Sequence, residues 1–281
     1  MDRFQSRLLV WYGLNRRDLP WRNTTNPYKI LVSEIMLQQT QVERVIPYYE
    51  LFIHQFPTIT DLANAPLSTV ITLWSGLGYN KRAVFLQNAA KGIIKRRSFP
   101  KTREDLQKLS GIGPYTAEAV LAFAFNYDAA PADTNIRRIF SRYFFKGAGT
   151  VVSINKMIQK ELPKGKARVW NNALMDFGSI VCTASSPQCL ACPLATSCRA
   201  YRAGNQESYL RFSAPQSRFE GSIRQMRGRI IEVLREARDH QLSIAVLAKK
   251  VAISPQMLNI RLQDLQKDGL VIRNGKTVRF I

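Results

Sequence analysis

Residues Leu109 to Asn135 read LSGIGPYTAEAVLAFAFNYDAAPADTN, and the fold prediction starts from this stretch. Gly111 and Gly113 flank Ile112, so the backbone can bend sharply there with its amide groups unshielded, and Pro114 suits the first turn of a following helix. A phosphate of a nucleic acid could bind those amides, because a helix N-terminus carries partial positive charge. An ordinary turn between two helices is the alternative interpretation, since such turns are common.

The composition points to a globular protein with a polyanionic partner. The chain has 281 residues and 46% apolar content, enough to bury two or three compact cores. Its 41 Lys and Arg against 20 Asp and Glu give a formal net charge of +21, which favours nucleic acid as the partner. A membrane would also suit that charge, but no apolar run approaches the ~20 residues that span a bilayer. The N-terminus lacks the pattern of a signal peptide, so we expect an intracellular, cytoplasmic protein.

The four cysteines form one local group. They are separated by six, two and five residues, which indicates a metal or cluster site rather than a disulfide framework. Four thiolates over about 17 residues can hold zinc or a 4Fe-4S cluster, and the chemistry of the spacing does not choose between them. The candidate ligands are Cys182, Cys189, Cys192 and Cys198.

Two carboxylates stand out as candidates for chemistry. Residues 27–56 predict a helix that begins at Pro27, and Glu34 interrupts its apolar turn. A carboxylate partly removed from water there would have a raised pKa, as a general acid near neutral pH requires. A solvent-facing glutamate is the alternative, which this helix alone favours. Asp133 precedes another predicted helix, where an N-cap is the usual role, and a carboxylate fixed in that way could also face a developing cation.

Two short segments suit contact with a duplex. The sequence GLGY at 76–79 would present Leu77 and Tyr79 on a bend as an apolar wedge beside a flipped base, and a buried loop is the alternative. The uncharged residues 38–41 suit hydrogen bonds to base edges, or equally a solvated helix end.

The C-terminal region changes character after a polar segment, residues 201–220, which we interpret as a linker. Helical patterns at 229–239, 244–251 and 256–268, the last capped by Ser254 and Pro255, precede a hairpin around Asn274 and Gly275. These elements predict a winged helix-turn-helix at 221–281. Its 12 Lys and Arg against 5 Asp and Glu favour a second contact with DNA or RNA, with a protein–protein role as the alternative.

The Gly-Ile-Gly hairpin, the downstream Asp133 and the four-cysteine loop together resemble the helix-hairpin-helix DNA glycosylase superfamily that includes endonuclease III and MutY. Several segments look like the MutY adenine DNA glycosylase family over roughly residues 5–200, namely LPW (19–21), SEIMLQQTQV (33–42), GLGY (76–79), GIGPYTA (111–117) and MDFG (175–178). The resemblance implies a mainly α, two-lobed fold with a 4Fe-4S cluster loop, to which the C-terminal pattern adds the small winged helix. We expect a cluster-bearing helical domain at 1–23 with 134–200 and a helix-hairpin-helix domain at 24–133.

The resemblance also implies an activity, which is hydrolysis of the N-glycosidic bond of adenine mispaired with 8-oxoguanine or guanine, in base excision repair. Glu34 would protonate the purine N7, and Asp133 would stabilise the oxocarbenium-like sugar. Tyr115 and Asn135 would support the two carboxylates and hold the attacking water. Relatives that also cut the strand carry a lysine at the position of Tyr115, so we expect a monofunctional enzyme.

The remaining residues carried over from the resemblance form two sets. The pocket for the flipped adenine would consist of Arg17, Trp21, Leu37 and Asp176. Contacts with the mispaired double-stranded DNA would come from Gln39, Thr40, Leu77, Tyr79, Gly111 and Gly113. We expect the protein to act as a monomer, associated with a prokaryotic nucleoid.

Two departures from the MutY pattern weaken the expected discrimination for 8-oxoguanine. A winged helix stands where that family usually carries a Nudix-like domain, and Asn80 replaces a tyrosine and instead looks like the thymine-mismatch and endonuclease III branches. Removal of thymine or uracil opposite guanine is therefore the alternative activity. A non-catalytic DNA-binding protein is disfavoured by the joint presence of Glu34, Tyr115, Asp133 and Asn135.

Overall fold

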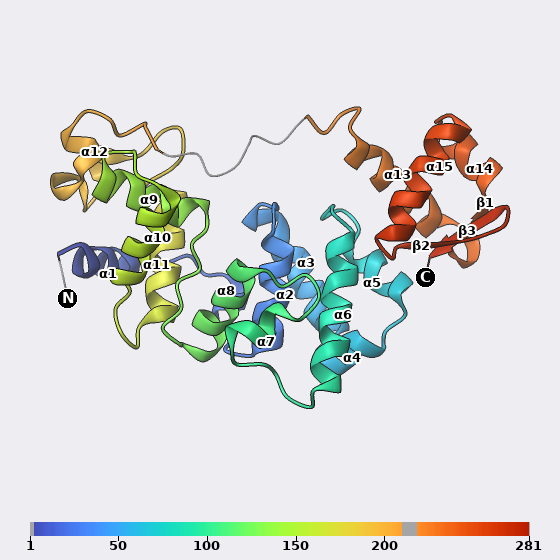
Figure 1. Ribbon diagram of the computed structural model, residues 1–281, viewed down its shortest axis with the longest axis horizontal. Coiled ribbons are helices and arrows are strands. Elements are labelled where there is room, and N and C mark those ends of the chain that lie inside the picture. Colours follow the sequence, from blue (N-terminus) through green and yellow to red (C-terminus); the bar gives the residue numbers. More distant parts are fainter. Residues whose placement is uncertain (1–2, 210–217, 281) are drawn as a thin grey trace. The chain divides into compact units, whose positions relative to one another are not determined.

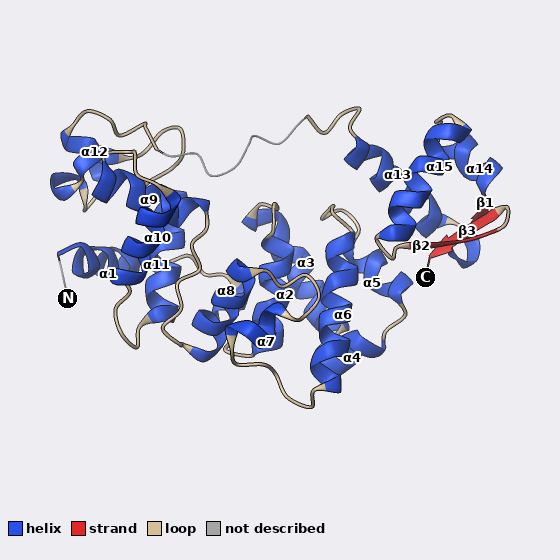
Figure 2. Cartoon of the chain, viewed as in Figure 1, coloured by secondary structure: helices blue, strands red, loops and turns tan. Residues whose placement is uncertain are grey.

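The computed structural model describes residues 3–209 and 218–280, which are mainly helical, and every strand among them belongs to one small sheet near the C-terminus (Figures 1 and 2). Contacts divide the chain into two compact units. The first comprises Met1–Leu31, Lys101–Gln107 and Ile112–Pro215, and the second comprises Val32–Pro100, Lys108–Gly111 and Gln216–Ile281. No helix in the described ranges is both long and apolar enough to cross a membrane.

The mainly α fold with a C-terminal winged helix is as predicted. This division does not test the domain boundaries expected from the sequence, which stay a prediction. Residues 210–217 of the expected linker lie outside the described residues. The helices of the first unit are α1 (Arg3–Asn15), η1 (Pro20–Arg22), α7 (Arg103–Gln107), α8 (Pro114–Phe125), α9 (Thr134–Phe145), α10 (Val151–Lys160), α11 (Ala167–Ile180), η2 (Cys189–Ala191), η3 (Ala195–Ser197) and α12 (Arg199–Arg202). The helix α2 (Pro27–Leu37) begins in the first unit, and its residues from Val32 onward belong to the second.

The core of the first unit is rich in aromatic side chains. The ring of Phe4 on α1 meets Phe140 on α9 and Trp170 on α11 edge to face, with both pairs of ring centroids 5.6 Å apart. All three side chains are fully buried, and Ile154 of α10 joins the same cluster. Edge-to-face pairs add to the free energy that their buried area already contributes. This core holds α9 and α11, the two helices that carry the candidate residues Asp133 and Asp176.

The helix-hairpin-helix turn has the backbone that its glycines predict. Gly111 has a φ of +74°, and a Cβ added there would lie 2.6 Å from the Cβ of Phe85, so conformation and space both require glycine. Gly113 is the N-cap of α8, and Pro114 occupies its first turn, as predicted. A side chain at Gly113 would meet open space, so the turn itself does not require glycine there.

The prediction of one helix over residues 27–56 is wrong. The structure has two helices, α2 and α3 (Val42–Gln55), separated by a break in which Gln39 has a φ of +58°. The apolar pattern continues through the break, so periodicity alone does not reveal it. The other helices of this part of the second unit are α4 (Ile59–Asn64), α5 (Leu67–Trp74) and α6 (Lys81–Lys95).

The C-terminal region forms the predicted winged helix. Its elements are α13 (Ile223–Glu236), η4 (Arg238–His240), β1 (Gln241–Ser243), α14 (Ile244–Val251), α15 (Pro255–Lys267), β2 (Val271–Asn274) and β3 (Thr277–Phe280). The sheet is antiparallel with strand order β1-β3-β2, and Asn274 pairs with Thr277 at the predicted hairpin. Ser254 caps α15 as predicted, whereas α13 begins at Ile223, before the predicted start at Arg229.

Candidate active site and DNA-binding residues

Asp133 is held rigidly at the N-terminus of α9. Its Oδ1 accepts a hydrogen bond from the backbone N–H of Ile136 at 2.7 Å, and its Oδ2 accepts one from Nδ2 of Asn135 at 3.1 Å. Burial raises the pKa of the Asp133 carboxyl, while these two hydrogen bonds and the charge of Arg138 act in the opposite direction. The predicted N-cap is confirmed, and the carboxylate has one fixed orientation.

A network of hydrogen bonds continues from Asn135 to the cysteine loop. Arg138 donates through Nη2 to Oδ1 of Asn135 at 2.8 Å and to the carbonyl of Gly178 at 2.7 Å, and through Nε to the carbonyl of Cys182 at 2.8 Å. A Cβ on Gly178 would lie 2.7 Å from the Cβ of Asn135, so this glycine lets α11 approach α9 closely. Both ends of the Asn135 amide are therefore held in place, beside Asp133.

Glu34 lies on α2 and is buried. Its exposed fraction is 6%, and its neighbours in the chain, Ser33 and Ile35, are each 1% exposed. A glutamate that points to solvent is therefore wrong for this position. Carboxylates are rarely buried without a function or a partner, which keeps Glu34 as a candidate acid.

Tyr115 lies in the first turn of α8 and lines a cavity of about 530 Å³ within the first unit. Glu118, one helical turn further, also lines it. Glu118 accepts a hydrogen bond from the backbone N–H of Ala130 at 3.0 Å and forms an ion pair with Arg103. This buried carboxylate therefore ties α8 to the segment that leads to Asp133, a role that the sequence analysis missed.

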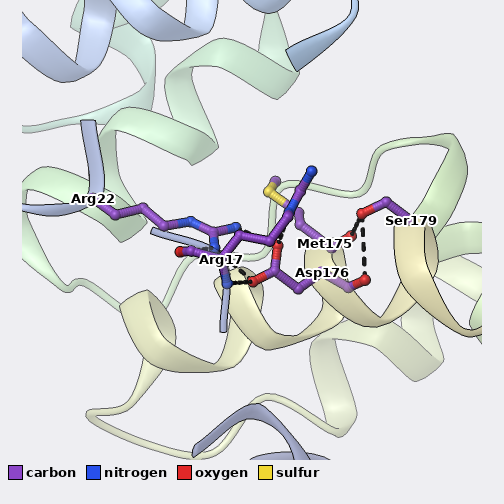
Figure 3. Close-up of polar contacts among 5 residues, drawn as sticks. All are labelled: Arg17, Arg22, Met175, Asp176 and Ser179. Carbon is purple, nitrogen blue, oxygen red and sulfur yellow. Dashed lines mark hydrogen bonds and ion pairs between the residues drawn. The ribbon is translucent and has the colours of Figure 1, made fainter. Parts of the chain in front are cut away.

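Asp176 on α11 binds two arginines at once (Figure 3). Its carboxylate accepts from the backbone N–H of Arg17 at 3.0 Å, from Nε of Arg17 at 2.6 Å, and from Nη1 and Nη2 of Arg22 at 2.6 and 2.8 Å. Burial of this fully enclosed carboxyl would raise its pKa, but the two arginines outweigh burial and hold the pKa below its usual value. Four donors occupy the roughly four acceptor directions of a carboxylate, so Asp176 orients the arginines.

The structure thus brings together two members of the predicted base pocket, Arg17 and Asp176, and adds Arg22, which the sequence analysis missed. Trp21 precedes Arg22 in η1 and is 8% exposed. Leu37, the fourth predicted member, is half-buried at the end of α2. Arg22 contacts Asp176, which is 154 positions away in the sequence. The only local sign of this role is that Arg22 directly follows the LPW segment.

Arg82 organises the predicted DNA-binding segments of the second unit. Its guanidinium is buried and donates to the carbonyls at the end of α2 and in the loop 76–79, and also to Oγ1 of Thr40 at 3.1 Å. The carbonyl acceptors are those of Ile35, Met36, Gln38, Leu77 and Gly78, at 2.5–3.2 Å. Burial lowers the pKa of Arg82 to about 10. Arg82 therefore closes the break after α2 and fixes the GLGY loop.

The two expected wedge residues differ in exposure. Leu77 is buried, with 5% of its surface exposed, whereas Tyr79 is 38% exposed and has a φ of +48°. The guanidinium groups of Arg82 and Arg224 lie 5.6 and 5.7 Å from the centre of the Tyr79 ring. Tyr79 is therefore the more accessible of the two, and Gln39 in the break after α2 is exposed as well.

The four cysteines gather around one small cavity of about 30 Å³. Burial raises the pKa of the Cys189, Cys192 and Cys198 thiols, that of Cys192 to about 12. Arg142 donates to Sγ of Cys182 at 3.4 Å, which supplies positive charge beside the sulfur atoms. Among the described residues, no three His, Cys, Asp or Glu side chains are arranged to hold a single metal ion. Four sulfur atoms around one cavity are a ligand set that suits either a zinc ion or a 4Fe-4S cluster.

Comparison with known proteins agrees with this geometry. Residues 32–164 match the family described as HhH-GPD superfamily base excision DNA repair protein, and residues 223–272 match a winged helix-turn-helix DNA-binding family. An adenine DNA glycosylase of Mycolicibacterium smegmatis is 37% identical over 274 residues, which cover 94% of this chain and 91% of the relative. One of Buchnera aphidicola subsp. Baizongia pistaciae is 42% identical over 210 residues, 70% of this chain and 58% of the relative. The chain thus spans less than two thirds of the latter's length.

Among solved structures, a thermostable thymine-DNA glycosylase is similar, with a TM-score of 0.67 and 32% identity over 71% of this chain and 95% of the other. The hairpin and the capped aspartate place the chain in the class of helix-hairpin-helix DNA repair proteins. The chain belongs to the HhH-GPD superfamily of base excision DNA repair proteins, in the family whose curated members are named adenine DNA glycosylase. The family predicted from the sequence is confirmed.

Proposed function

We propose that this protein is a monofunctional DNA glycosylase that removes adenine mispaired with 8-oxoguanine or guanine. The observation that carries the proposal is the carboxylate of Asp133, fixed by the N–H of Ile136 and by Asn135 at the N-terminus of α9. The helix N-terminus supports a negative charge there, as stabilisation of a sugar cation requires. The name of the relatives supports adenine as the base.

The reaction proceeds with two carboxylates in opposite charge states. Glu34, protonated, donates to N7 of the purine, and the bond between C1′ and N9 breaks with its electron pair going to the base. Asp133, ionised, stabilises the positive charge that remains on the sugar. Water then adds to C1′ and releases a proton, which restores the acid. Asn135 holds Asp133 in position through the hydrogen bond at 3.1 Å.

The remaining pocket residues position the base rather than react with it. Both oxygens of Asp176 already accept hydrogen bonds, so its role is to orient Arg17 and Arg22. Trp21 and Leu37 provide apolar surface for the flipped adenine. Tyr115 lacks an amine and forms no Schiff base with the sugar, so strand cleavage does not follow base release.

A 4Fe-4S cluster fits the cysteine loop and would be held by Cys182, Cys189, Cys192 and Cys198. When bound, such a cluster ties the loop that follows α11 into one fixed shape. Arg142 offsets part of the negative charge of the thiolates.

Double-stranded DNA is the proposed substrate, and the protein acts on it as a monomer at the nucleoid of a prokaryotic cell. The backbone amides of the Gly111–Gly113 hairpin bind a phosphate, as the N-terminus of α8 favours. Gln39, Thr40, Leu77 and Tyr79 are the proposed contacts with the mispair. The formal charge of +21 supports the duplex as partner.

Single-turnover release of free base tests the proposal. Matched duplexes carry adenine opposite 8-oxoguanine, adenine opposite guanine, thymine opposite guanine and uracil opposite guanine, with Asp133→Asn as the inactive control. The proposal expects adenine release only, with no covalent trapping of wild-type enzyme by borohydride. Efficient trapping would contradict the monofunctional assignment.

Removal of thymine or uracil opposite guanine is the second candidate. It is favoured by the similarity to a thymine-DNA glycosylase over 95% of that chain, and by Asn80 in the GLGYN segment. Thymine or uracil release alone in the same experiment would select it.

A further inference from the structure

The winged helix packs against the helices that carry the GLGY loop. Ile71 of α5 and Val84 of α6 belong to the same buried cluster as Ile230 of α13 and Leu258 of α15. Asp268, at the end of α15, accepts from Nζ of Lys81 at 2.6 Å and also pairs with Arg227 of α13. These contacts bring the first helix of the winged helix to the loop.

Lys81 and Arg227 together keep Asp268 ionised, since their hydrogen bonds and charges outweigh its burial and lower its pKa. A further hydrogen bond joins Arg235 of α13 to the hydroxyl of Ser75. The ion pairs of Asp268, the hydrogen bond of Arg235 and the shared apolar cluster all hold α13 beside the GLGY loop.

A groove of about 1,100 Å³ lies along this contact, and we call it the α13 groove. Its charged lining is strongly basic, because six cations face two carboxylates, one of which, Asp268, already pairs with two of the cations. The cations are Arg44, Lys81, Arg82, Arg224, Arg227 and Arg229, and the carboxylates are Glu232 and Asp268. Such a surface attracts a polyanion.

Tyr79 joins the groove to the loop. Its hydroxyl accepts a hydrogen bond from Nη1 of Arg224 at 2.8 Å, and its ring lies near the guanidinium groups of Arg82 and Arg224. Gln39 lines the same groove. Two of the residues proposed to contact the mispair therefore line the same groove as the arginines of α13.

The helix that reads DNA in many winged helix-turn-helix proteins is α15, and here its surface is poorly suited to DNA. Arg261 pairs with Asp264 at 2.9 Å, with 12% of its side chain exposed. Met257 and Ile260 are exposed at 38% and 46%, and Lys267 at its last turn is the exposed cation of α15. Four arginines lie on α13 instead.

We propose that the winged helix binds DNA through the α13 groove rather than through α15, and that the groove holds the phosphates of the strand opposite the excised adenine. The inference rests on the proposed function for the identity of the two strands. The α13 groove would thus supply a contact with the strand opposite the excised adenine, which the proposed catalytic residues do not provide.

The test compares two arginines of the winged helix that are both exposed. Arg229→Ala removes a cation from the α13 groove, and Arg273→Ala removes one from the wing hairpin and is the matched control. Affinity for a duplex with adenine opposite 8-oxoguanine is measured against salt concentration in the Asp133→Asn background, where the base stays attached. Thermal unfolding of each variant checks that the module is intact, and Arg229→Lys restores the charge.

We expect Arg229→Ala to lower the slope of log affinity against log salt by about one, and Arg273→Ala to leave the slope unchanged. Neutral methylphosphonates on the strand opposite adenine weaken binding by wild type and have less effect on Arg229→Ala. A smaller salt slope in Arg273→Ala alone would refute DNA binding through the α13 groove. An unchanged salt slope in both variants would also refute it. A methylphosphonate effect confined to the adenine strand would overturn the strand assignment. Absence of base release by wild type on every duplex refutes the proposed function instead, and the slopes still decide the groove.

Discussion

Replacement of Asp176 by asparagine is the sharpest perturbation of the candidate base pocket. The carboxylate is fully buried, and it holds Arg17 and Arg22 through four hydrogen bonds of 2.6–3.0 Å. Asparagine is nearly the same size, so the change removes the charge and one acceptor oxygen without opening a cavity. The new amide NH2 group faces two arginine N–H groups that donated to a carboxylate oxygen in the wild type.

The expected loss follows from these contacts. A hydrogen bond to a charged group contributes about 1.5–3 kcal/mol, and two of the four are lost. The side chains of Arg17 and Arg22 are 24% and 10% exposed, so water compensates them poorly. Breaking such a buried pair destabilises a protein by about 3–5 kcal/mol, and we expect Asp176→Asn to fall in that range.

The assay is chemical unfolding of wild type and Asp176→Asn at several pH values. Ser179→Ala is the matched control, because Ser179 is exposed on the same helix and its hydroxyl donates to the backbone carbonyls of Met175 and Asp176 (Figure 3). The arginines lower the pKa of Asp176, so its contribution is present above the unfolded pKa and is lost as the pH falls through the folded pKa. The difference between the two proteins should therefore shrink in acid. A loss below about 1 kcal/mol at neutral pH, or an equal loss in Ser179→Ala, would refute the reasoning.

Three further predictions concern other parts of the chain. Arg82→Met leaves the carbonyls after α2 and in the GLGY loop without their donor, so we expect about 3 kcal/mol of destabilisation in chemical unfolding and a smaller loss in Arg82→Lys; equal stability of Arg82→Met and wild type would contradict it. Asp133 must be ionised to act, and burial raises its pKa above the ordinary value of 3.8. The rate of single-turnover base release should therefore begin to decrease, as the pH is lowered, at a pH above 3.8. Asn135→Ala removes a hydrogen bond that lowers this pKa and should move the acid limb to higher pH, and an unmoved limb would argue against the role of Asn135. Cys192→Ser should lose iron and the brown colour of a 4Fe-4S protein, whereas a colourless wild type with stoichiometric zinc and full activity would contradict the cluster.

Local signals account for much of the fold. The glycines and proline of the hairpin, the aspartate before α9 and the serine before α15 each act on the backbone within a few residues, so the sequence identifies them directly. The break between α2 and α3 was missed because the apolar period runs through it, and the partners of Gln38 and Thr40 come from Arg82, more than 40 positions away.

The candidate site was predicted less completely, for the same reason. Asp176 and Arg17 were expected in the base pocket through the resemblance, but Arg22 and Glu118 were not identified. Their roles depend on partners brought together by tertiary packing, such as Arg22 and Asp176 across 154 positions. Pattern and propensity describe neighbours along the chain and carry no such information.

Free adenine released in a single turnover from a duplex with adenine opposite 8-oxoguanine tests the central claim most directly. The account predicts one adenine released per wild-type active site with the strand left intact, and none from Asp133→Asn. Intact adenine after incubation with folded, cluster-bearing wild type, or equal release by Asp133→Asn, would contradict it.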